Sequence, residues 1–278
     1  MIPNEYLEIM LHAAIEAGQA TLQYFNGPEV VMKSDQSPLT KADLESDRII
    51  HEYLIKTGLP ILSEEDKLIP YDIRKSWTSF WLVDPLDGTK EFINKRNEFT
   101  INIALIEKSQ PVAGVVYAPA LKMLYFAHHS SGALKNILSG PDFCIFNDIL
   151  KNSQRITAGA VPEDLRMVAS KSHLSAETEA FIKKIECHRS ITGMKPIGSS
   201  LKLCMVAEGS ADIYPRLGPT MEWDTAAAHA VVACSGALVL RISDLTPLTY
   251  NKPDLLNPYF VVLKPELLGV IKDIISKE

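Results

Sequence analysis

A pair of aspartates in one short segment has the residue types and the spacing to bind a metal ion. The segment reads Asp84-Pro85-Leu86-Asp87-Gly88-Thr89 and follows the apolar run 80–83. Two carboxylates, a hydroxyl and a free backbone carbonyl at Leu86 would form an all-oxygen set, which hard cations such as Mg²⁺ prefer. Gly88 permits the positive φ that such a turn often needs. Asp-Gly is also a common turn dipeptide, so these residues alone fit a surface turn equally well.

A second acidic segment repeats this pattern. Glu64 follows the apolar run 59–62 and precedes Glu65 and Asp66. Three consecutive acids usually form a solvated loop, and this remains the simplest reading of the last two. If the strand before Glu64 lies beside the strand before Asp84, however, the two carboxylates converge.

Two further acids are predicted at helix starts, where each also has a structural explanation. Asp43 follows Thr40 by three residues, which is the spacing of a capping box, and an acid there meets the positive end of the helix. Asp224 precedes the alanine-rich helix 226–234 and could cap it. Because alanines allow close packing, we expect this helix start to be buried, and a buried carboxylate needs a cation.

The elements that must position these acids follow from hydrophobic periodicity. Apolar stripes at helical spacing predict helices over 4–26 and 41–56. The strand 80–83 is expected to stop at Asp84-Pro85, because proline has no N–H to donate to a sheet. Three runs separated by turn residues predict an antiparallel meander over 99–106, 112–117 and 123–127.

A polar stretch over 136–155 is the predicted boundary between two domains, 1–155 and 156–278. Beyond it, the order strand, polar loop, helix occurs at 167–170 and 175–186, which is the α/β order that places ligands at the carboxyl ends of strands. Gly198-Ser199-Ser200 then precedes a helix over 201–208. Free N–H groups at such a helix start attract phosphate, although an N-cap serine explains the segment as well.

Composition excludes several classes of protein. The chain has 278 residues, of which 46% are apolar and 22% charged, and no apolar run approaches the roughly 18 residues that span a bilayer. A net charge of -6 disfavours a broad nucleic-acid surface, but a small anion needs only a local basic pocket or a metal. The N-terminus lacks the order of a signal peptide, so a cytoplasmic protein is expected. The cysteines are far apart and predict reduced thiols: Cys144, Cys187, Cys204 and Cys234.

Three segments together resemble the signatures of the lithium-sensitive, magnesium-dependent phosphomonoesterases that include inositol monophosphatase. They are Ile61 to Glu65, Asp84 to Thr89, and Trp223-Asp224-Thr225-Ala226-Ala227. The resemblance covers nearly the whole chain. It implies an α/β fold, a layered α/β/α/β/α sandwich with an antiparallel sheet in the N-terminal half and a mixed sheet in the C-terminal half.

Other segments are similar to the bisphosphate nucleotidases within that family. They are Lys90-Glu91-Phe92, Gly198 to Lys202, and Tyr214-Pro215-Arg216. This likeness implies removal of the 3'-phosphate from adenosine 3',5'-bisphosphate, which leaves AMP and phosphate. Lys202 and Arg216 are the informative residues, because a second phosphate needs a cation where a neutral inositol ring does not.

The resemblance also implies a role for each acidic residue. One Mg²⁺ would be held by Glu64, Asp84 and the Leu86 carbonyl, a second by Asp84, Asp87 and Asp224, and a third, looser ion near Glu64. Asp43 and Thr89, with Glu64, would activate the attacking water. The implied substrate contacts are Glu64, Leu86, Asp87, Gly88, Thr89, Ser170, His173, Ser199, Lys202, Arg216 and Asp224. The N-terminal domain would therefore bind the metals and the C-terminal domain the nucleotide.

The expected partner is a small nucleotide bisphosphate, and no nucleic-acid polymer. The chain is expected to be a monomer or homodimer, and peripheral association with the inner membrane is left open. One alternative is an inositol or sugar phosphatase of the same family. Another is a non-catalytic nucleotide or metal sensor, which would not need the water-activating pair Asp43 and Thr89.

Overall fold

A seven-stranded sheet forms the N-terminal half of the computed structural model, which describes residues 4–27, 29–32, 38–139, 145–170 and 175–276. Its strands lie in chain order, and neighbours are antiparallel except for β3 and β4, which are parallel. The predicted meander forms its centre. The strands are β3 (Ile61–Ser63), β4 (Ser79–Asp87), β5 (Thr100–Glu107), β6 (Gln110–Ala118), β7 (Met123–His128), β8 (Gly132–Ile137) and β9 (Gln154–Arg155).

A five-stranded mixed sheet forms the C-terminal half of the described chain, as predicted. In order across the sheet, its strands are β11 (Ile191–Ile197), β10 (Leu165–Ser170), β12 (Ile213–Arg216), β14 (Phe260–Leu263) and β13 (Leu238–Arg241). The strand β10 runs parallel to both of its neighbours, whereas β14 runs antiparallel to both of its own. A separate short pair joins β1 (Val30–Met32) to β2 (Pro38–Thr40).

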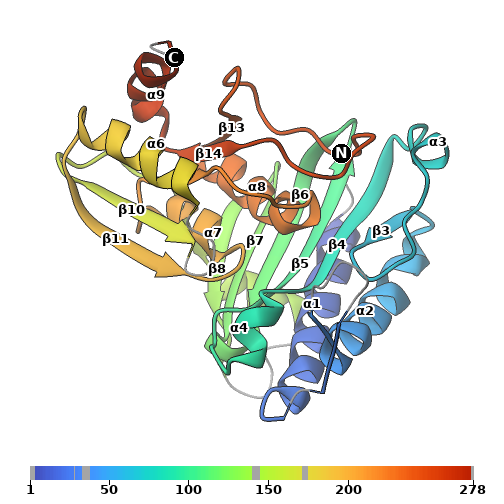
Figure 1. The fold of residues 1–278 in the computed structure, drawn as a ribbon. Helices are drawn as coiled ribbons and strands as arrows, with labels where there is room; N and C mark the ends of the chain where they lie inside the picture. Colours follow the sequence, from blue (N-terminus) through green and yellow to red (C-terminus); the bar gives the residue numbers. More distant parts are fainter. Residues whose placement is uncertain (1–3, 28, 33–37, 140–144, 171–174, 277–278) are drawn as a thin grey trace.

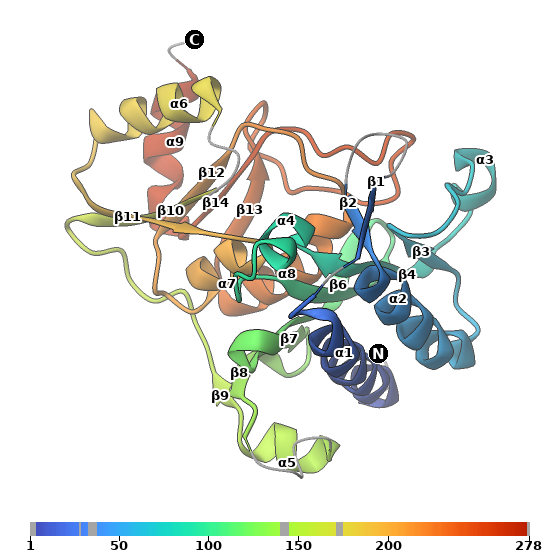
Figure 2. The same ribbon diagram turned by 60° about the horizontal axis from the view of Figure 1, so that its bottom comes forward.

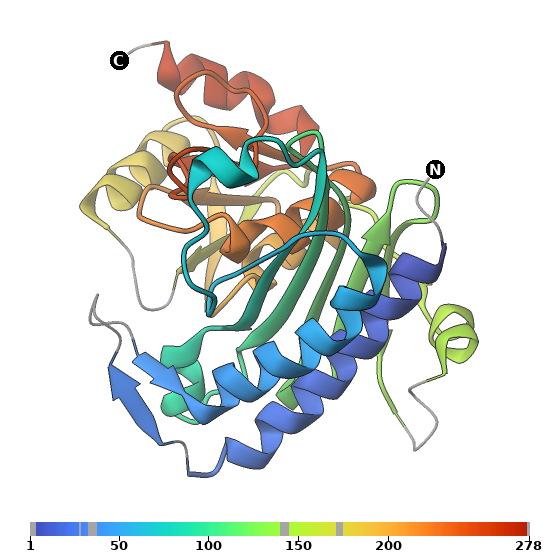
Figure 3. The ribbon, with the colours of Figure 1, turned by 90° about the vertical axis from the view of Figure 1, so that its right-hand side faces the viewer.

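Helices complete five layers, which confirms the predicted sandwich (Figure 1). The helices α1 (Asn4–Tyr24) and α2 (Lys41–Leu54) cover the outer face of the large sheet (Figure 3). The helices α7 (Leu201–Ala207) and α8 (Trp223–Ser235) lie between the sheets, and α6 (Ala176–Glu186) and α9 (Leu268–Ile275) cover the far face of the small sheet. Shorter helices are α3 (Tyr71–Arg74), α4 (Thr89–Ile93) and α5 (Phe146–Lys151). No described helix is both long and apolar enough to cross a membrane.

The strand β4 is buried on both faces, which explains its continuous apolar sequence. Trp81 and Val83 pack with α1 and α2, whereas Phe80 and Leu82 pack with α7 and α8. The predicted close packing of the alanine-rich helix occurs where α8 crosses β6. A Cβ atom on Gly114 would lie 2.2 Å from the carbonyl oxygen of Ala227, so only glycine permits this approach.

The prediction that β4 stops at Asp84-Pro85 is wrong. Pairing with β5 is irregular between Asp84 and Asp87 and resumes where Asp87 lies opposite Thr100. Pro85 lies inside this irregularity, where the ladder needs no N–H, and its carbonyl accepts a hydrogen bond from Ser46 Oγ at 2.6 Å. Such bulges tolerate proline and turn side chains away from the regular alternation of a strand.

One hydrophobic cluster crosses the predicted domain boundary. It includes Leu82 from the large sheet, Val168 from the small sheet and Val231 from α8. The chain leaves the large sheet after residue 155 and enters the small sheet at residue 165. The division of the chain into two domains at 155 stays a prediction. Cys187, Cys204 and Cys234 are free thiols, as expected, and Cys144 lies outside the described residues.

Candidate metal centre and active site

Three carboxylates from three different elements meet at one point. Carboxylate oxygens of Glu64, Asp84 and Asp224 all lie within 4.8 Å of one another. The first residue follows β3, the second lies in β4, and the third is in the first turn of α8. Because β3 and β4 are parallel neighbours, their acids emerge at the same edge of the sheet, which is the condition that the sequence required.

Asp84 lies deepest in this cluster and is 1% exposed. Its Oδ1 accepts the N–H of Leu86 at 3.1 Å, and its buried Oδ2 has no hydrogen-bond partner among the described residues. Burial, and then the charges of Glu64, Asp87 and Asp224, raise the pKa of Asp84 well above its ordinary value. A buried, partnerless carboxylate oxygen is costly, and a cation would remove that cost.

Asp87 ends β4, three residues after Asp84, and the charges of the two carboxylates repel each other. Its Oδ2 accepts the N–H of Ser200 at 2.6 Å and longer bonds, both 3.4 Å, from Thr100 Oγ1 and Asn102 Nδ2. Burial raises the pKa of Asp87 to about 6, although the positive charge of Lys202 opposes this shift. The contact with Ser200 joins Asp87 to the start of α7.

Asp224 serves the helix start as well as the cluster. Its Oδ2 accepts the N–H of Met221 at 2.8 Å, a local contact close to the predicted cap, although Glu222 is the N-cap residue. Burial and the charges of Asp87 and Glu64 raise its pKa well above the ordinary value. Four mutually repelling, oxygen-only side chains therefore fit a hard divalent cation such as Mg²⁺.

Asp43 has both of the roles that its sequence position allowed. Its Oδ2 accepts the N–H of Thr40 at 2.7 Å and the Thr40 hydroxyl at 2.5 Å, which completes the capping box of α2. Its Oδ1 accepts the hydroxyl of Thr89 at 3.2 Å, and that hydroxyl also lies 3.3 Å from the Leu86 carbonyl. Burial raises the pKa of Asp43. Gly88 adopts a φ of +93°, so the turn has the backbone geometry that its glycine predicted.

A cavity of about 280 Å³ brings most of the predicted residues together. Predicted residues in its lining are Glu64, Asp87, Gly88, Thr89, Ser199, Lys202, Arg216 and Asp224. Figure 2 shows α4, which begins at Thr89, in the region where the two halves of the chain meet. Ser170 ends β10, and the contacts predicted for its side chain and for His173 fall outside the described part of the structure.

Two buried cations line the same cavity as the acids. Lys202 Nζ donates to the carbonyl of Ser199 at 2.5 Å and, at 3.4 Å, to that of Ile197. Burial lowers the pKa of Lys202 to about 8, and the carboxylate of Asp87 limits this shift. Arg216 Nη2 donates to the Pro219 carbonyl at 2.8 Å. We call the carboxylates of Glu64, Asp84, Asp87 and Asp224 the acidic side of the site, and Lys202 with Arg216 its cationic side.

Ser199 adds a hydroxyl to the cationic side. Its φ is +50°, and its buried Oγ has no hydrogen-bond partner among the described residues. A buried hydroxyl without a partner is unusual in a folded protein and is readily explained by a ligand contact. The Ser199 carbonyl accepts the Lys202 ammonium, so the two residues form one unit beside the cavity.

Sequence reasoning missed the polar side chains of β5 that support Asp87. Asn102 Oδ1 accepts the hydroxyl of Ser200 at 2.8 Å, and Thr100 Oγ1 lies 2.9 Å from the same hydroxyl. All three residues are buried. The available signal was the alternation Thr100-Ile101-Asn102-Ile103 in a strand whose apolar residues are all core. This pattern predicts a strand but does not show that its polar side chains contact the site.

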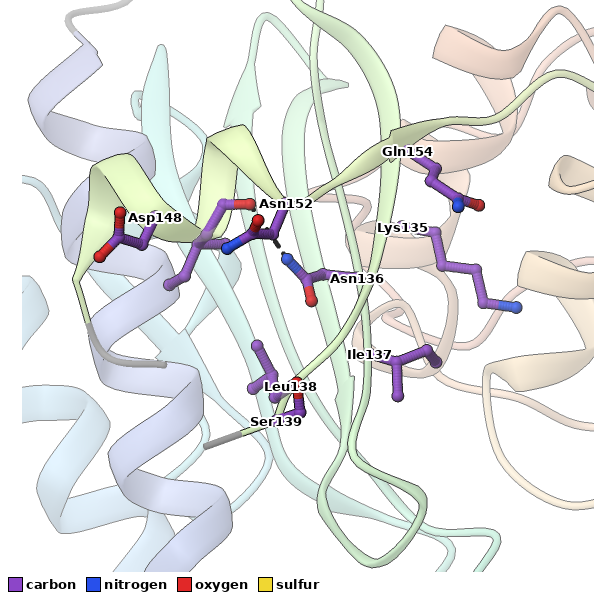
Figure 4. Close-up of a pocket in the computed structure, with 9 residues that line it drawn as sticks. Lys135, Asn136, Ile137, Leu138, Ser139, Asp148, Asn152 and Gln154 are labelled. Atoms are coloured by element: carbon purple, nitrogen blue, oxygen red, sulfur yellow. Dashed lines mark hydrogen bonds between the residues drawn. The ribbon is translucent and has the colours of Figure 1, made fainter. Parts of the chain in front are cut away.

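A larger hollow, of about 590 Å³, lies beside β8 and α5 (Figure 4). Lys135 and Asp148 are the charged residues among those that line it, and the others are amide, hydroxyl and aliphatic side chains. The Lys135 ammonium is already paired with Glu208 at 2.5 Å. Size alone would favour this hollow, but the convergent acids and cations favour the smaller cavity as the reactive site.

Comparison with known proteins gives a consistent family assignment. A profile of the inositol monophosphatase family matches residues 3–275. The 3'(2'),5'-bisphosphate nucleotidase CysQ of Salmonella typhimurium is 40% identical over 92% of this chain and 98% of that protein. The protein of the same name from Escherichia coli K12 is 39% identical over the same shares of the two chains.

Solved structures agree with this assignment. The crystal structure of CysQ from Bacteroides thetaiotaomicron, a bacterial member of the inositol monophosphatase family, is similar with a TM-score of 0.82 and 42% identity, over 92% of this chain and 96% of that one. An IMPase from Thermotoga maritima has a TM-score of 0.75 at 22% identity, over 98% of both chains, and shows likeness in fold alone.

Proposed function

The chain belongs to the inositol monophosphatase family, and on this premise we propose that it is a magnesium-dependent 3'(2'),5'-bisphosphate nucleotidase. It removes the 3'-phosphate of adenosine 3',5'-bisphosphate and releases AMP and phosphate. The observation that carries the substrate assignment is the presence of two buried cations, Lys202 and Arg216, opposite the carboxylate cluster in one cavity.

A substrate with two phosphates fits a cavity that is lined by both carboxylates and cations. The phosphate to be removed would lie against the acidic side, where its charge must be neutralised by metal. The phosphate that stays would lie against Lys202 and Arg216, because charge-assisted hydrogen bonds to phosphate are among the strong ones in proteins. Monophosphates of inositol and of sugars have no second phosphate to place there, so the cations favour the nucleotide over these substrates.

The proposed metal ligands are the converging oxygens. Glu64, Asp84 and the Leu86 carbonyl would hold one Mg²⁺, and Asp84, Asp87 and Asp224 a second, with a looser third ion near Glu64. When bound, these ions neutralise the phosphate, acidify a water molecule and stabilise the leaving oxygen. The partnerless Oδ2 of Asp84 supports its assignment as the shared ligand.

The remaining chemistry is assigned to Asp43 and Thr89. Because Thr40 occupies Asp43 Oδ2, the other carboxylate oxygen is left for the Thr89 hydroxyl. In donating its proton to Asp43, this hydroxyl would present a lone pair to the attacking water and so accept the proton of the water. The raised pKa of Asp43 suits a group that receives a proton. The N–H groups of Gly88 and Thr89 are proposed to hold phosphate oxygens.

Phosphate release from two substrates tests this function. The full chain is assayed with adenosine 3',5'-bisphosphate and with inositol 1-phosphate, with and without Mg²⁺. The expected result is faster turnover of the nucleotide, dependence on Mg²⁺, and AMP as the product. Faster turnover of the inositol substrate would instead support a sugar phosphatase, and no turnover with any metal would support a binding protein.

A further inference from the structure

We propose that Asp47 and His51, on α2, are positioning residues that hold Glu64 in the metal centre. They form a side-chain clamp, which we define as Asp47 and His51 on the helix together with Ser63 and Asp66 on the segment that carries Glu64. Neither helix residue belongs to the acidic signatures, and neither lines the cavity. The inference rests on the metal centre of the proposed function and assigns the residues that set its geometry.

The clamp contacts the chain both before and after Glu64. Ser63 Oγ donates to Asp47 Oδ1 at 2.5 Å, so the residue before Glu64 is tied to α2. His51 Nε2 lies 3.2 Å from Asp66 Oδ2, so the residue two positions after it is tied to the same helix. Asp47 and His51 are four residues apart and therefore lie on one helix face.

The two helix residues also support each other. His51 Nδ1 lies 3.0 Å from the Asp47 carbonyl oxygen and 3.4 Å from Asp47 Oδ1. The hydrogen bond to Asp47, supported by the charge of Asp66, raises the pKa of His51 to about 9 against the effect of burial. The imidazole lies between two carboxylates, so these three side chains form one cluster that joins α2 to the segment after β3.

Glu64 needs such support because β3 ends at Ser63. Its N–H donates to the Val83 carbonyl at 3.2 Å, but the chain then leaves the sheet in a turn. The neighbouring charges of Asp84 and Asp224 repel a carboxylate at this position. The turn has hydrogen bonds of its own, from the Asp66 N–H to the Ser63 carbonyl and from the Glu65 N–H to Ser63 Oγ, both 3.4 Å long, and the clamp adds side-chain contacts to α2 that oppose this repulsion.

The same helix also holds Asp43 one turn away from Asp47. Asp43 accepts a hydrogen bond from Thr89, and Asp47 accepts one from Ser63, the residue before Glu64. A single rigid element therefore fixes the proton-accepting pair and a metal-binding carboxylate relative to each other. Outer partners of this kind commonly change metal affinity by about 10–100-fold when they are removed.

Direct metal binding tests the clamp. Mn²⁺ binding to the full chain is measured by calorimetry for the wild type, Asp47→Ala and Ser63→Ala. Glu45→Ala is the matched control, since it removes an acid from the exposed side of the same helix, where Glu45 pairs with Arg48. We expect about 10–100-fold weaker Mn²⁺ binding in both clamp variants, no change in the control, and partial recovery in Asp47→Asn, which keeps an acceptor for Ser63.

The other outcomes distinguish failure of the clamp from failure of the metal centre itself. If the double variant Asp47→Ala/Ser63→Ala loses the sum of the two single losses, the residues act independently and the clamp is refuted. Loss of one ion from the stoichiometry with unchanged affinity for the rest would make the cluster a separate metal site. If the wild type binds no Mn²⁺, the metal centre itself fails, whereas a binding wild type with an unaffected Asp47→Ala refutes the clamp alone. Ser63→Ala decides the matter if Asp47→Ala does not fold.

Discussion

The acidic and cationic sides of the cavity are held in different ways. On the acidic side, a buried oxygen of Asp84 has no partner among the residues that the structure describes, and burial with mutual repulsion raises the pKa values of Asp84, Asp87 and Asp224. On the cationic side, Lys202 and Arg216 each donate to backbone carbonyls. Charges of one sign repel one another on the first side, whereas the cations of the second side are held by backbone carbonyls beside the Ser199 hydroxyl, which has no partner among the described residues.

This difference separates two contributions to function. Cation binding on the acidic side should affect both stability and turnover, because it relieves repulsion within the folded chain. Phosphate binding on the cationic side should affect the choice of substrate, because it adds contacts to a wall that is stable on its own. Variants on the two sides should consequently fail in different ways.

The largest effect is expected from Asp84→Asn. The neutral amide cannot replace a shared anionic ligand, and metal-ion catalysis supplies several kcal/mol of stabilisation, so kcat/KM should fall by about 10³-fold or more. In metal-free buffer the variant should melt at the same temperature as the wild type or higher, since it removes a repelling buried charge. Kinetics and thermal melting on one preparation check both statements. Full turnover, or unfolding without metal, would contradict them.

A smaller and more selective loss is expected from Arg216→Gln. Hydrogen bonds to charged groups contribute about 1.5–3 kcal/mol, so kcat/KM for adenosine 3',5'-bisphosphate should fall by about 10–150-fold. Hydrolysis of adenosine 3'-monophosphate, which lacks the second phosphate, should change little. Lys183→Gln, on the exposed side of α6, is the matched control for the loss of a cation. An equal loss on both substrates would place Arg216 in the chemical step instead.

Metal removal should destabilise the folded chain without unfolding it. Magnesium at about 100 times its dissociation constant stabilises by about 2.7 kcal/mol. For a chain of this size, that corresponds to a melting temperature about 5 °C higher than with chelator. Differential scanning calorimetry measures the difference, and Asp84→Asn should show a much smaller one. The same shift in both proteins would mean that the ion acts elsewhere.

The smallest effect is expected on the pH dependence of stability, through the protonation of His51 in the clamp. The pKa of His51 is raised from 6.5 to about 9 in the folded chain, so its stabilising effect is fully present below pH 6.5 and is lost as pH rises through 9. The free energy of unfolding of the wild type should exceed that of His51→Gln by about 1 kcal/mol at pH 6. Above about pH 10 the two proteins should be equally stable. Chemical denaturation in chelator, repeated across this range, checks the sign. A gain that grows with pH would contradict the ion pair.

Sequence reasoning worked best where the site is local. The segment Asp84 to Thr89 and the acid at Glu64 could be recognised because each is contiguous, and the parallel pairing of two short strands then brought them together. The two explanations of Asp43, a cap and a catalytic acid, could not be separated because they do not exclude each other: the carboxylate caps α2 with one oxygen and contacts Thr89 with the other, and its catalytic role stays a prediction. Periodicity predicted most helices and the meander.

The failures have one cause, which is contact between residues distant in the chain. The path of β4 through Pro85 depends on its pairing with β5 on the far side of the irregularity, which no local pattern records. The contact between Asn102 and Ser200 joins residues 98 positions apart. The clamp was missed for the same reason, because Ser63 and Asp47 meet only when β3 lies against α2.

We propose that carboxylates from β4, from α8 and from the turn after β3 form one metal centre. Equilibrium binding of Mn²⁺, followed by electron paramagnetic resonance of the free ion, tests it most directly. The wild type should bind at least two ions per chain, and Asp84→Asn should lose both at the same ion concentration. If the wild type binds none, or the variant binds as many as the wild type, the carboxylates are not a metal centre.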